Sequence, residues 1–241
     1  MIIEVIPTAQ HITPEKVANG LVVVFDILRS TTCMVTALAN GAKALYPAMN
    51  QQEALELKAN LPFTGVLLAG EEKGLKIPGF DLGNSPQEFV TTKIKGKHII
   101  MATTNGTLAI RRASSAQQLI IGSFLNMTVL CDYVLAQDSD LTLVCAGTQG
   151  KFCLEDTLAA GMLISWLRRR VSNLIYSDLA LTAESLYRCY QDSLLLGISA
   201  SENGRQLKDR QQCQDLRNSV HVNAIPILPM CHSGVITVNK R

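Results

Sequence analysis

The chain has 241 residues, of which 47% are hydrophobic and 17% are charged, so it supplies a sizeable core and little material for a disordered tail. Its 22 Lys and Arg nearly balance its 20 Asp and Glu. This balance leaves no strong overall field to draw the chain onto nucleic acid or an anionic membrane, and any anion site must be local.

Short β-branched runs alternate with helical segments from the start of the chain. Strands are predicted at residues 2–6, 21–25, 44–47, 66–69, 98–102, 119–122 and 141–146. Helices are predicted between them at 31–40, 51–60, 104–113 and 125–136. Near-continuous apolar strands separated by helices are typical of a parallel sheet that is covered on both faces. The pattern therefore predicts a three-layer α/β fold with a largely parallel sheet.

After Gly147 the pattern changes. Long helices are predicted over 154–171 and 178–196, and two short apolar runs follow at 224–228 and 235–238, so the C-terminal part is mostly helical. No Pro- or Gly-rich linker marks the change, which lies near 147–153. We therefore predict one compact unit over 1–241 rather than two domains. The apolar helices of this part could pack within the chain or against a second copy, as in a homodimer.

Several features argue against other classes of protein. The seven cysteines are scattered with no C-x-x-C pair, and the four histidines lack metal-ligand spacing, which disfavours a disulfide framework or a zinc cage. The basic runs at 111–112 and 168–170 are typical of solvated helix ends. The N-terminus does not resemble a signal peptide, and no apolar run approaches the roughly 20 residues that cross a bilayer. The expected location is the cytoplasm.

In open parallel sheets, ligands bind beyond the carboxyl ends of the strands, and four strands of this chain end in dense polar clusters. The first cluster places Asp26 at a strand end and Arg29 beside the hydroxyls of Ser30 and Thr31. Asp26 could bind a hard cation or attack phosphorus, while Arg29 could pair with anionic oxygens. Ser30 and Thr31 suit a helix cap equally well.

The second cluster is a long Gly-rich loop over residues 70–86. Loops of this length in compact domains are often binding loops. Glu71, nearest the strand, is a candidate metal ligand, and Lys76 and Asn84 are candidates for contact with substrate oxygens. Ser85 is explained as a cap before a proline, and Lys73 as a solvated charge.

The third cluster runs from Thr103 through Thr104, Asn105 and Gly106 to Thr107. Small hydroxyl and amide side chains, with a glycine that permits close backbone approach, suit an anion cradle at a helix N-terminus. An ordinary helix cap by Thr104 or Asn105 is the competing interpretation.

The fourth cluster contains Gly147 and Thr148 and leads to Glu155 and Asp156 at the start of a helix. Negative charge is favoured there by the helix dipole. Because adjacent helical residues point about 100° apart, only one of the two carboxylates can readily face a pocket.

These clusters resemble the 2-phosphosulfolactate phosphatase family. The resemblance is carried, in order, by FDILRSTT, GEEKGLKIPGFDLGNSP, TTNGT, CAGTQGKFCLEDTLAAG and SENGRQL. It implies a magnesium-dependent phosphatase of coenzyme M synthesis that acts on phosphate esters of 2-hydroxycarboxylic acids, with 2-phospho-3-sulfolactate as the named substrate. By matching motifs, it implies site roles for Asp26, Arg29, Glu71, Lys76, Asn84, Thr104, Asn105 and Asp156. Glu72 departs from the family, which commonly has arginine there, and this puts the sulfonate-bearing substrate in doubt.

Phosphoryl transfer requires neutralisation of the phosphate charge and a positioned oxygen nucleophile. We expect Mg²⁺ to be held by Asp26 and Glu71, with Glu155 or Asp156 nearby, while Arg29 and the N–H groups before the Thr104 helix share the phosphate charge. Either water or Asp26 would attack phosphorus.

Two other functional classes stay open. An oxidoreductase would share the order of elements, but no G-x-G-x-x-G follows a strand. A non-catalytic protein that binds small anions would need neither Asp26 nor Glu71. The expected partner is a small phosphorylated acid, with no nucleic acid and no membrane.

Overall fold

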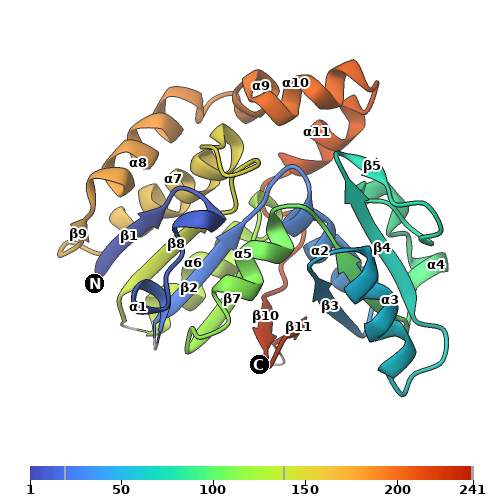
Figure 1. Ribbon diagram of the computed structural model, residues 1–241. Helices are drawn as coiled ribbons and strands as arrows, with labels where there is room; N and C mark the ends of the chain where they lie inside the picture. Colours follow the sequence, from blue (N-terminus) through green and yellow to red (C-terminus); the bar gives the residue numbers. More distant parts are fainter. Residues whose placement is uncertain (19, 138, 240–241) are drawn as a thin grey trace.

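One mixed sheet organises the computed structural model, which describes residues 1–18, 20–137 and 139–239 (Figure 1). Its strands in the described residues are β1 (Ile2–Ile6), β2 (Leu21–Phe25), β3 (Ala44–Ala48), β4 (Leu67–Glu72), β5 (Leu75–Lys76), β6 (His98–Ala102), β7 (Gln118–Gly122), β8 (Leu141–Cys145), β9 (Ile175–Tyr176), β10 (Pro229–His232) and β11 (Val235–Val238).

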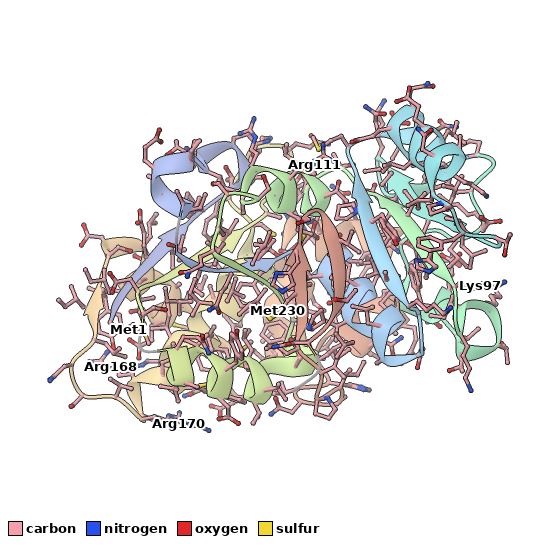
Figure 2. All side chains as sticks on the ribbon, turned by 90° about the horizontal axis from the view of Figure 1, so that it is seen from below. Met1, Lys97, Arg111, Arg168, Arg170 and Met230 are labelled. Atoms are coloured by element: carbon pink, nitrogen blue, oxygen red, sulfur yellow. The ribbon has the colours of Figure 1, made fainter. Side chains whose placement is uncertain are left out.

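The sheet order is β5-β4-β6-β3-β11-β10-β7-β2-β8-β1-β9. Strands β4, β6 and β3 pair in parallel, and so do β7, β2, β8, β1 and β9. The antiparallel hairpin of β10 and β11 stands between these two parallel groups, pairing with β7 on one side and with β3 on the other. The end of the chain thus completes the middle of the sheet, and Figure 2 shows Met230 of β10 in this central position.

Helices cover the sheet and continue into the C-terminal part. The longer ones are α2 (Ser30–Ala39), α3 (Gln51–Asn60), α5 (Gly106–Arg112), α6 (Met127–Gln137), α7 (Leu154–Arg168), α8 (Asp178–Tyr190), α9 (Leu194–Ala200), α10 (Glu202–Asp209) and α11 (Cys213–Ser219). Shorter turns of helix are α1 (Pro14–Val17), α4 (Thr91–Ile94), η1 (Ala9–His11), η2 (Pro86–Glu88) and η3 (Phe124–Asn126).

Strand β2 shows why the protein has three layers. All five of its residues are buried. Leu21, Val23 and Phe25 belong to a core with residues of α6, α7 and α8. Val22 and Val24 belong to a second core with residues of α2 and α5. Because successive side chains of a strand point to opposite faces, an unbroken apolar strand needs helices on both sides. The predicted three-layer α/β class is confirmed.

The predicted strands and helices before residue 147 are all present, with small shifts at their ends. The prediction of one helix over 178–196 was wrong, because the chain turns after Tyr190, where the Ser193 N–H bonds to the Tyr190 carbonyl. This turn lets α9 pack against α7.

The short apolar run at 224–228 is not part of the sheet. The Ile225 N–H donates to the Leu125 carbonyl, and the Ile227 carbonyl accepts from Asn126 Nδ2 at 3.2 Å. These backbone groups are therefore bonded to η3 and its surroundings, and the sheet strand begins at Pro229.

The basic runs lie at helix ends, as predicted. Arg111 and Arg112 close α5, and Arg168 closes α7. Figure 2 shows Arg168 and Arg170 at the edge of the molecule, where they pair with Glu184 and Asp132. The seven cysteines are free thiols. Within the described ranges, no helix has both the length and the apolar composition of a membrane span.

Gly161 sets the distance between α7 and α8. A Cβ atom added at Gly161 would lie 2.0 Å from the Ala183 carbonyl oxygen, which is part of the α8 backbone. Backbone cannot yield as a flexible side chain does, so the two helices would have to separate.

We predict that Gly161→Ala destabilises the protein, by about 1–3 kcal/mol as for other overpacked cores. Helix propensity alone predicts the opposite change in stability, because it favours alanine over glycine in a helix by about 0.8–1 kcal/mol. Urea unfolding of the two proteins measures the difference. A variant more stable than the wild type would contradict the close packing of α7 on α8.

Candidate functional site

A cavity of about 360 Å³ lies where the loops after four strands meet the C-terminal helices. Its walls come from the loop after β2, the hairpin of β4 and β5, the loops after β6 and β8, and α10. The lining residues are Asp26, Leu28, Arg29, Glu71, Lys73, Gly74, Asn84, Thr104, Asn105, Thr148, Gln149, Asn203, Gln206, Leu207 and Arg210. The wall therefore carries acidic, basic and amide side chains.

Asp26 is the buried acid of this cavity, with 8% of its surface exposed. Its Oδ1 accepts the Ser30 N–H at 3.3 Å, and a Cβ added at Gly106 would lie 2.7 Å from its Oδ2. Burial raises the pKa of Asp26 to about 7. The N–H groups of Ser30 and Gly106 oppose this rise, and the charges of Glu71 and Glu155 add to it.

Asp156 lies behind Asp26 and ties two loops together. Its Oδ1 accepts the Ile27 N–H at 2.8 Å after β2, and its Oδ2 accepts the Gly147 N–H at 3.2 Å after β8. Burial, with the charges of Asp26 and Glu155, raises the pKa of Asp156 well above its ordinary value. Asp156 does not line the cavity, so its first role is to position the loops.

Glu155 is also buried and also lies outside the cavity lining. Its Oε1 accepts Asn203 Nδ2 at 2.7 Å, and the same Nδ2 lies 2.7 Å from Thr148 Oγ1. Asn203 thus joins α10 to the loop after β8.

Glu71 joins β4 to the loop after β6. Its Oε1 accepts both the N–H and the hydroxyl of Thr104 at 2.9 Å. Its Oε2 accepts the Gly74 N–H at 2.6 Å. Glu71 lines the cavity, while its orientation is fixed by groups on two different strand ends.

The segment from Thr103 to Thr107, predicted as an anion cradle, places Thr104 and Asn105 in the cavity lining, with several of its polar groups bonded within the protein. The Thr104 N–H is bonded to Glu71, and the Gly106 N–H faces Asp26. Buried Thr107 donates to the Thr103 carbonyl at 2.6 Å. Asn105 Oδ1 accepts the Gln149 N–H at 3.0 Å. The Thr104 and Gly106 N–H groups therefore orient the carboxylates of Glu71 and Asp26.

The hydroxyls of the first cluster behave in the same way. Thr31 is buried, and its hydroxyl donates to the Asp26 carbonyl at 3.0 Å. The Ser30 hydroxyl accepts from Thr103 Oγ1 at 3.3 Å. Neither lines the cavity, so both support the loop that carries Asp26.

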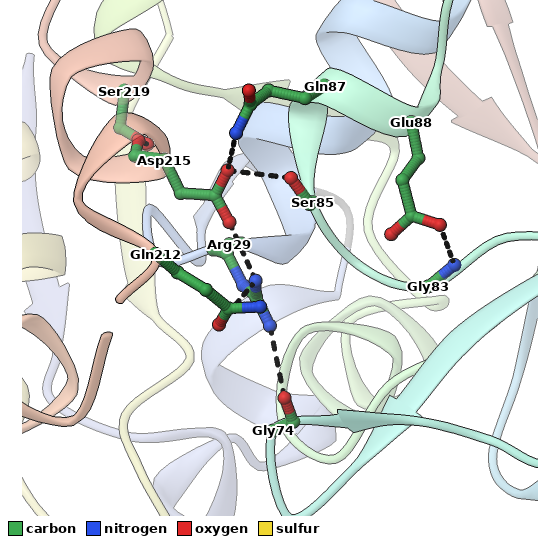
Figure 3. A network of polar contacts seen from close by, with 9 residues as sticks. All are labelled: Arg29, Gly74, Gly83, Ser85, Gln87, Glu88, Gln212, Asp215 and Ser219. Carbon is green, nitrogen blue, oxygen red and sulfur yellow. Dashed lines mark hydrogen bonds and ion pairs between the residues drawn. The ribbon is translucent and has the colours of Figure 1, made fainter. Parts of the chain in front are cut away.

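Arg29 is held by a partner that the sequence analysis did not identify (Figure 3). Its Nη1 lies 2.7 Å from Asp215 Oδ2 and 3.2 Å from Gln212 Oε1, and its Nη2 lies 3.3 Å from the Gly74 carbonyl. The Arg29 and Asp215 side chains are 6% and 1% exposed. Asp215 Oδ1 in turn accepts from Ser85 and Gln87. The C-terminal helix α11 therefore fixes the guanidinium at the cavity wall.

Asn84 has a buried oxygen that is left without a partner. The residue is 6% exposed and lines the cavity, and its Oδ1 finds no hydrogen-bond donor in the described part of the chain. A buried polar atom without a partner is costly, so this oxygen is open to a water or a bound group at the cavity wall.

Two charged residues of the β4–β5 hairpin lie outside the cavity. Lys76 was predicted to meet substrate oxygens, but it is exposed and its Nζ donates to the Asp81 carbonyl at 2.8 Å. Glu72 stands where the family commonly has arginine. It lines a neighbouring pocket together with Met49 and Ile77. The negative charge of Glu72 is therefore not part of the wall that contains Arg29.

The four predicted metal-binding carboxylates do not form a ready-made ligand cluster. In residues 1–18, 20–137 and 139–239, no group of three or more His, Cys, Asp or Glu side chains is arranged to hold a metal. Asp26 and Glu71 face the cavity, whereas Glu155 and Asp156 are turned toward Asn203 and backbone amides. The structure thus brings together two acids of the four at the cavity wall.

The residues that sequence reasoning missed come mainly from the C-terminal helices. Asn203, Gln206, Leu207 and Arg210 line the cavity, and Asp215 holds Arg29. The motif SENGRQL contains three of these lining residues, and it was the one feature of the sequence that pointed to this part of the site. Asp215 has no local signal, since it lies 186 positions from its partner.

Comparison with known proteins finds a family match and similar relatives along most of the chain. The family model for 2-phosphosulpholactate phosphatase matches residues 6–234. A probable 2-phosphosulfolactate phosphatase of Caldanaerobacter subterraneus subsp. tengcongensis is 35% identical over 240 residues, which are 100% of this chain and 99% of the relative. The protein of the same name from Clostridium acetobutylicum is 40% identical over 192 residues, 80% of this chain and 81% of the relative.

We predict that Asp215→Ala costs about 3–5 kcal/mol of stability, because it leaves a buried guanidinium without its carboxylate. The control is Glu4→Ala, which removes an exposed ion pair with Lys16 at 3.9 Å and should cost about 0–1 kcal/mol. Urea unfolding measures both. Equal, small losses for the two variants would show that the contact between Arg29 and Asp215 does not stabilise the fold.

Proposed function

Since the chain belongs to the 2-phosphosulpholactate phosphatase family, we propose that it is a phosphoric monoester hydrolase whose substrate is 2-phospho-3-sulfolactate. The products of this reaction are 3-sulfolactate and phosphate. We further propose that the reaction requires Mg²⁺. Its expected setting is coenzyme M synthesis in the cytoplasm.

The observation that carries the proposal is the loop after β2, which brings an acid and a guanidinium to one small cavity. Asp26 and Arg29 both line the cavity, and both are buried. Phosphoryl transfer needs this combination, because an arginine stabilises the charge on the transferring group while an acid organises the nucleophile or the metal. A non-catalytic anion site would have no use for a buried carboxylate beside the bound anion.

The residues at the cavity wall are suited to Mg²⁺. Magnesium is usually held by one or two carboxylates together with waters and substrate phosphate, so a protein cluster of three acids is not required. Asp26 and Glu71 supply two carboxylates, and their repulsion is among the causes that raise the pKa of Asp26. The unpartnered Oδ1 of Asn84 is a further oxygen at the same wall.

Each side chain has a role in this arrangement. Asp26 and Glu71 would hold the cation, which when bound neutralises phosphate charge and activates a water. Arg29 pairs with the phosphate oxygens, and Asp215 keeps its guanidinium in place. Asp156 holds the loop of Asp26 against the loop after β8. The Thr104 and Gly74 N–H groups keep Glu71 turned to the cavity.

We predict that the purified protein releases phosphate from 2-phospho-3-sulfolactate in the presence of Mg²⁺ and that EDTA abolishes this release. Asp26→Asn should lower kcat/KM by about a hundredfold or more, because it removes a charge that acts at the reacting group. The matched control is Asp132→Asn on the outside of α6, which should change nothing. Colorimetric phosphate detection measures all three proteins.

Other outcomes separate the alternatives. Phosphate release that EDTA does not affect would exclude the role of the metal. Binding of substrate without any release would favour the anion-binding protein. If turnover occurs, a phosphoenzyme trapped by rapid quench assigns Asp26 as the nucleophile, and the absence of one assigns the attack to water.

A further inference from the structure

Two guanidinium groups converge on Gly74 at the cavity wall. The Gly74 carbonyl accepts Arg29 Nη2 at 3.3 Å. On the other side, a Cβ added at Gly74 would lie 1.7 Å from Arg210 Nη1, so the Arg210 guanidinium lies directly against the glycine Cα. The second nitrogen, Arg210 Nη2, donates to the Lys73 carbonyl at 2.9 Å. Glycine is favoured here by its φ of +78°, a backbone conformation that other residues rarely adopt.

The two guanidiniums differ in how their charges are balanced. Arg29 is buried and is paired with the buried carboxylate of Asp215 at 2.7 Å. Arg210 and Lys73 are exposed, and neither forms an ion pair with an acidic side chain in the described residues. Both line the cavity. The cavity rim thus carries two positive charges that have no ion-pair partner among the described residues.

We propose that Arg210 and Lys73 form a second anion subsite, which binds the sulfonate of the substrate while Arg29 binds the phosphate. This assignment rests on the proposed phosphatase function. It identifies the residues that would distinguish a substrate with an additional strong acid from a simple phospho-2-hydroxy acid.

The positions of the three cations explain the division of roles. Arg29 lies three residues from Asp26 on one loop and is fixed by its contacts with Asp215, Gln212 and Gly74. A rigid cation beside the buried acid suits the group that reacts. Arg210 and Lys73 come from the end of α10 and from the turn of the β4–β5 hairpin, and they are solvent-accessible. Such a rim suits a group that is bound but not transferred.

The size and chemistry of the ligand fit this division. A cavity of about 360 Å³ admits a small molecule, so two anionic groups that reach both subsites must be separated by few bonds. A sulfonate is permanently ionised and has three acceptor oxygens. It can therefore accept from a guanidinium and an ammonium at the same time.

The test compares two substrates that differ in the sulfonate, 2-phospho-3-sulfolactate and 2-phospholactate. Arg210→Met and Lys73→Met should each raise KM for the sulfonated substrate about tenfold, the scale of one hydrogen bond to a charged group. The kcat for this substrate should stay unchanged, because a group that does not react is held equally in the ground and transition states. Neither kinetic constant should change for 2-phospholactate.

Arg205→Met is the matched control, since Arg205 lies on the same helix and does not line the cavity. It should leave KM for both substrates unchanged, and thermal unfolding should show that all variants fold. Equal rises in KM for the two substrates, or no rise for either, would overturn the assignment.

Calorimetric binding of 3-sulfolactate separates failure of this subsite from failure of the proposed function, because it needs no turnover. The wild type should bind 3-sulfolactate about tenfold more tightly than Arg210→Met. That result in a protein that releases no phosphate would preserve the subsite and reject the phosphatase. Equal binding by both proteins would reject the subsite, whatever the turnover.

Discussion

Acidic side chains are crowded together at one end of the sheet, and each is held there by backbone or amide N–H groups. Asp156 accepts the amides of Ile27 and Gly147, and Glu71 accepts those of Thr104 and Gly74. Burial and mutual repulsion raise the pKa of both Asp26 and Asp156, so the cluster is unfavourable as a set of free anions. The same hydrogen bonds that offset part of this cost also join the loops after β2, β4, β6 and β8. The contacts that hold the loops of the site together are therefore the same contacts that keep the repelling carboxylates close to one another.

The C-terminal part completes both the sheet and the site. The β10–β11 hairpin stands between the two groups of parallel strands, and α10 and α11 supply Asn203, Arg210 and Asp215 to the cavity region. Figure 1 shows these helices passing over the top of the sheet to the side where β5 lies. Residues of α10 and α11 also belong to the core that contains β1, β2 and β8. The guanidinium of Arg29 is thus positioned by α11, which follows all the parallel strands of the sheet along the chain.

Most of the sheet could be predicted because an apolar β-branched run bounded by polar clusters is a local signal. Asp26 and Arg29 could be located from the rule that ligands bind at the carboxyl ends of parallel strands. Composition did not reveal which of the threonines line the cavity. Thr31 and Thr107 have the same side chain as Thr104, but the first two are bonded to nearby backbone in buried positions. Asp215 could not be found at all, since its partner is distant in sequence and its own surroundings in α11 carry no periodic or motif signal. The apolar run at 224–228 could not be assigned to a strand or a turn from the sequence, because apolar character alone does not show whether a backbone bonds to the sheet or to a neighbouring turn.

The central proposal is that Asp26 and Glu71 hold a cation at the cavity wall. The most direct measurement is the titration of the Asp26 carboxyl by carbon-13 NMR, without metal and with saturating Mg²⁺. The account predicts a pKa of about 7 for Asp26 in the metal-free protein. It also predicts a large fall when Mg²⁺ binds, because the cation favours the ionised form, so that Mg²⁺ affinity weakens as the pH drops below that value. An Asp26 pKa near the ordinary value of about 3.9, or one that Mg²⁺ does not move, would contradict the account.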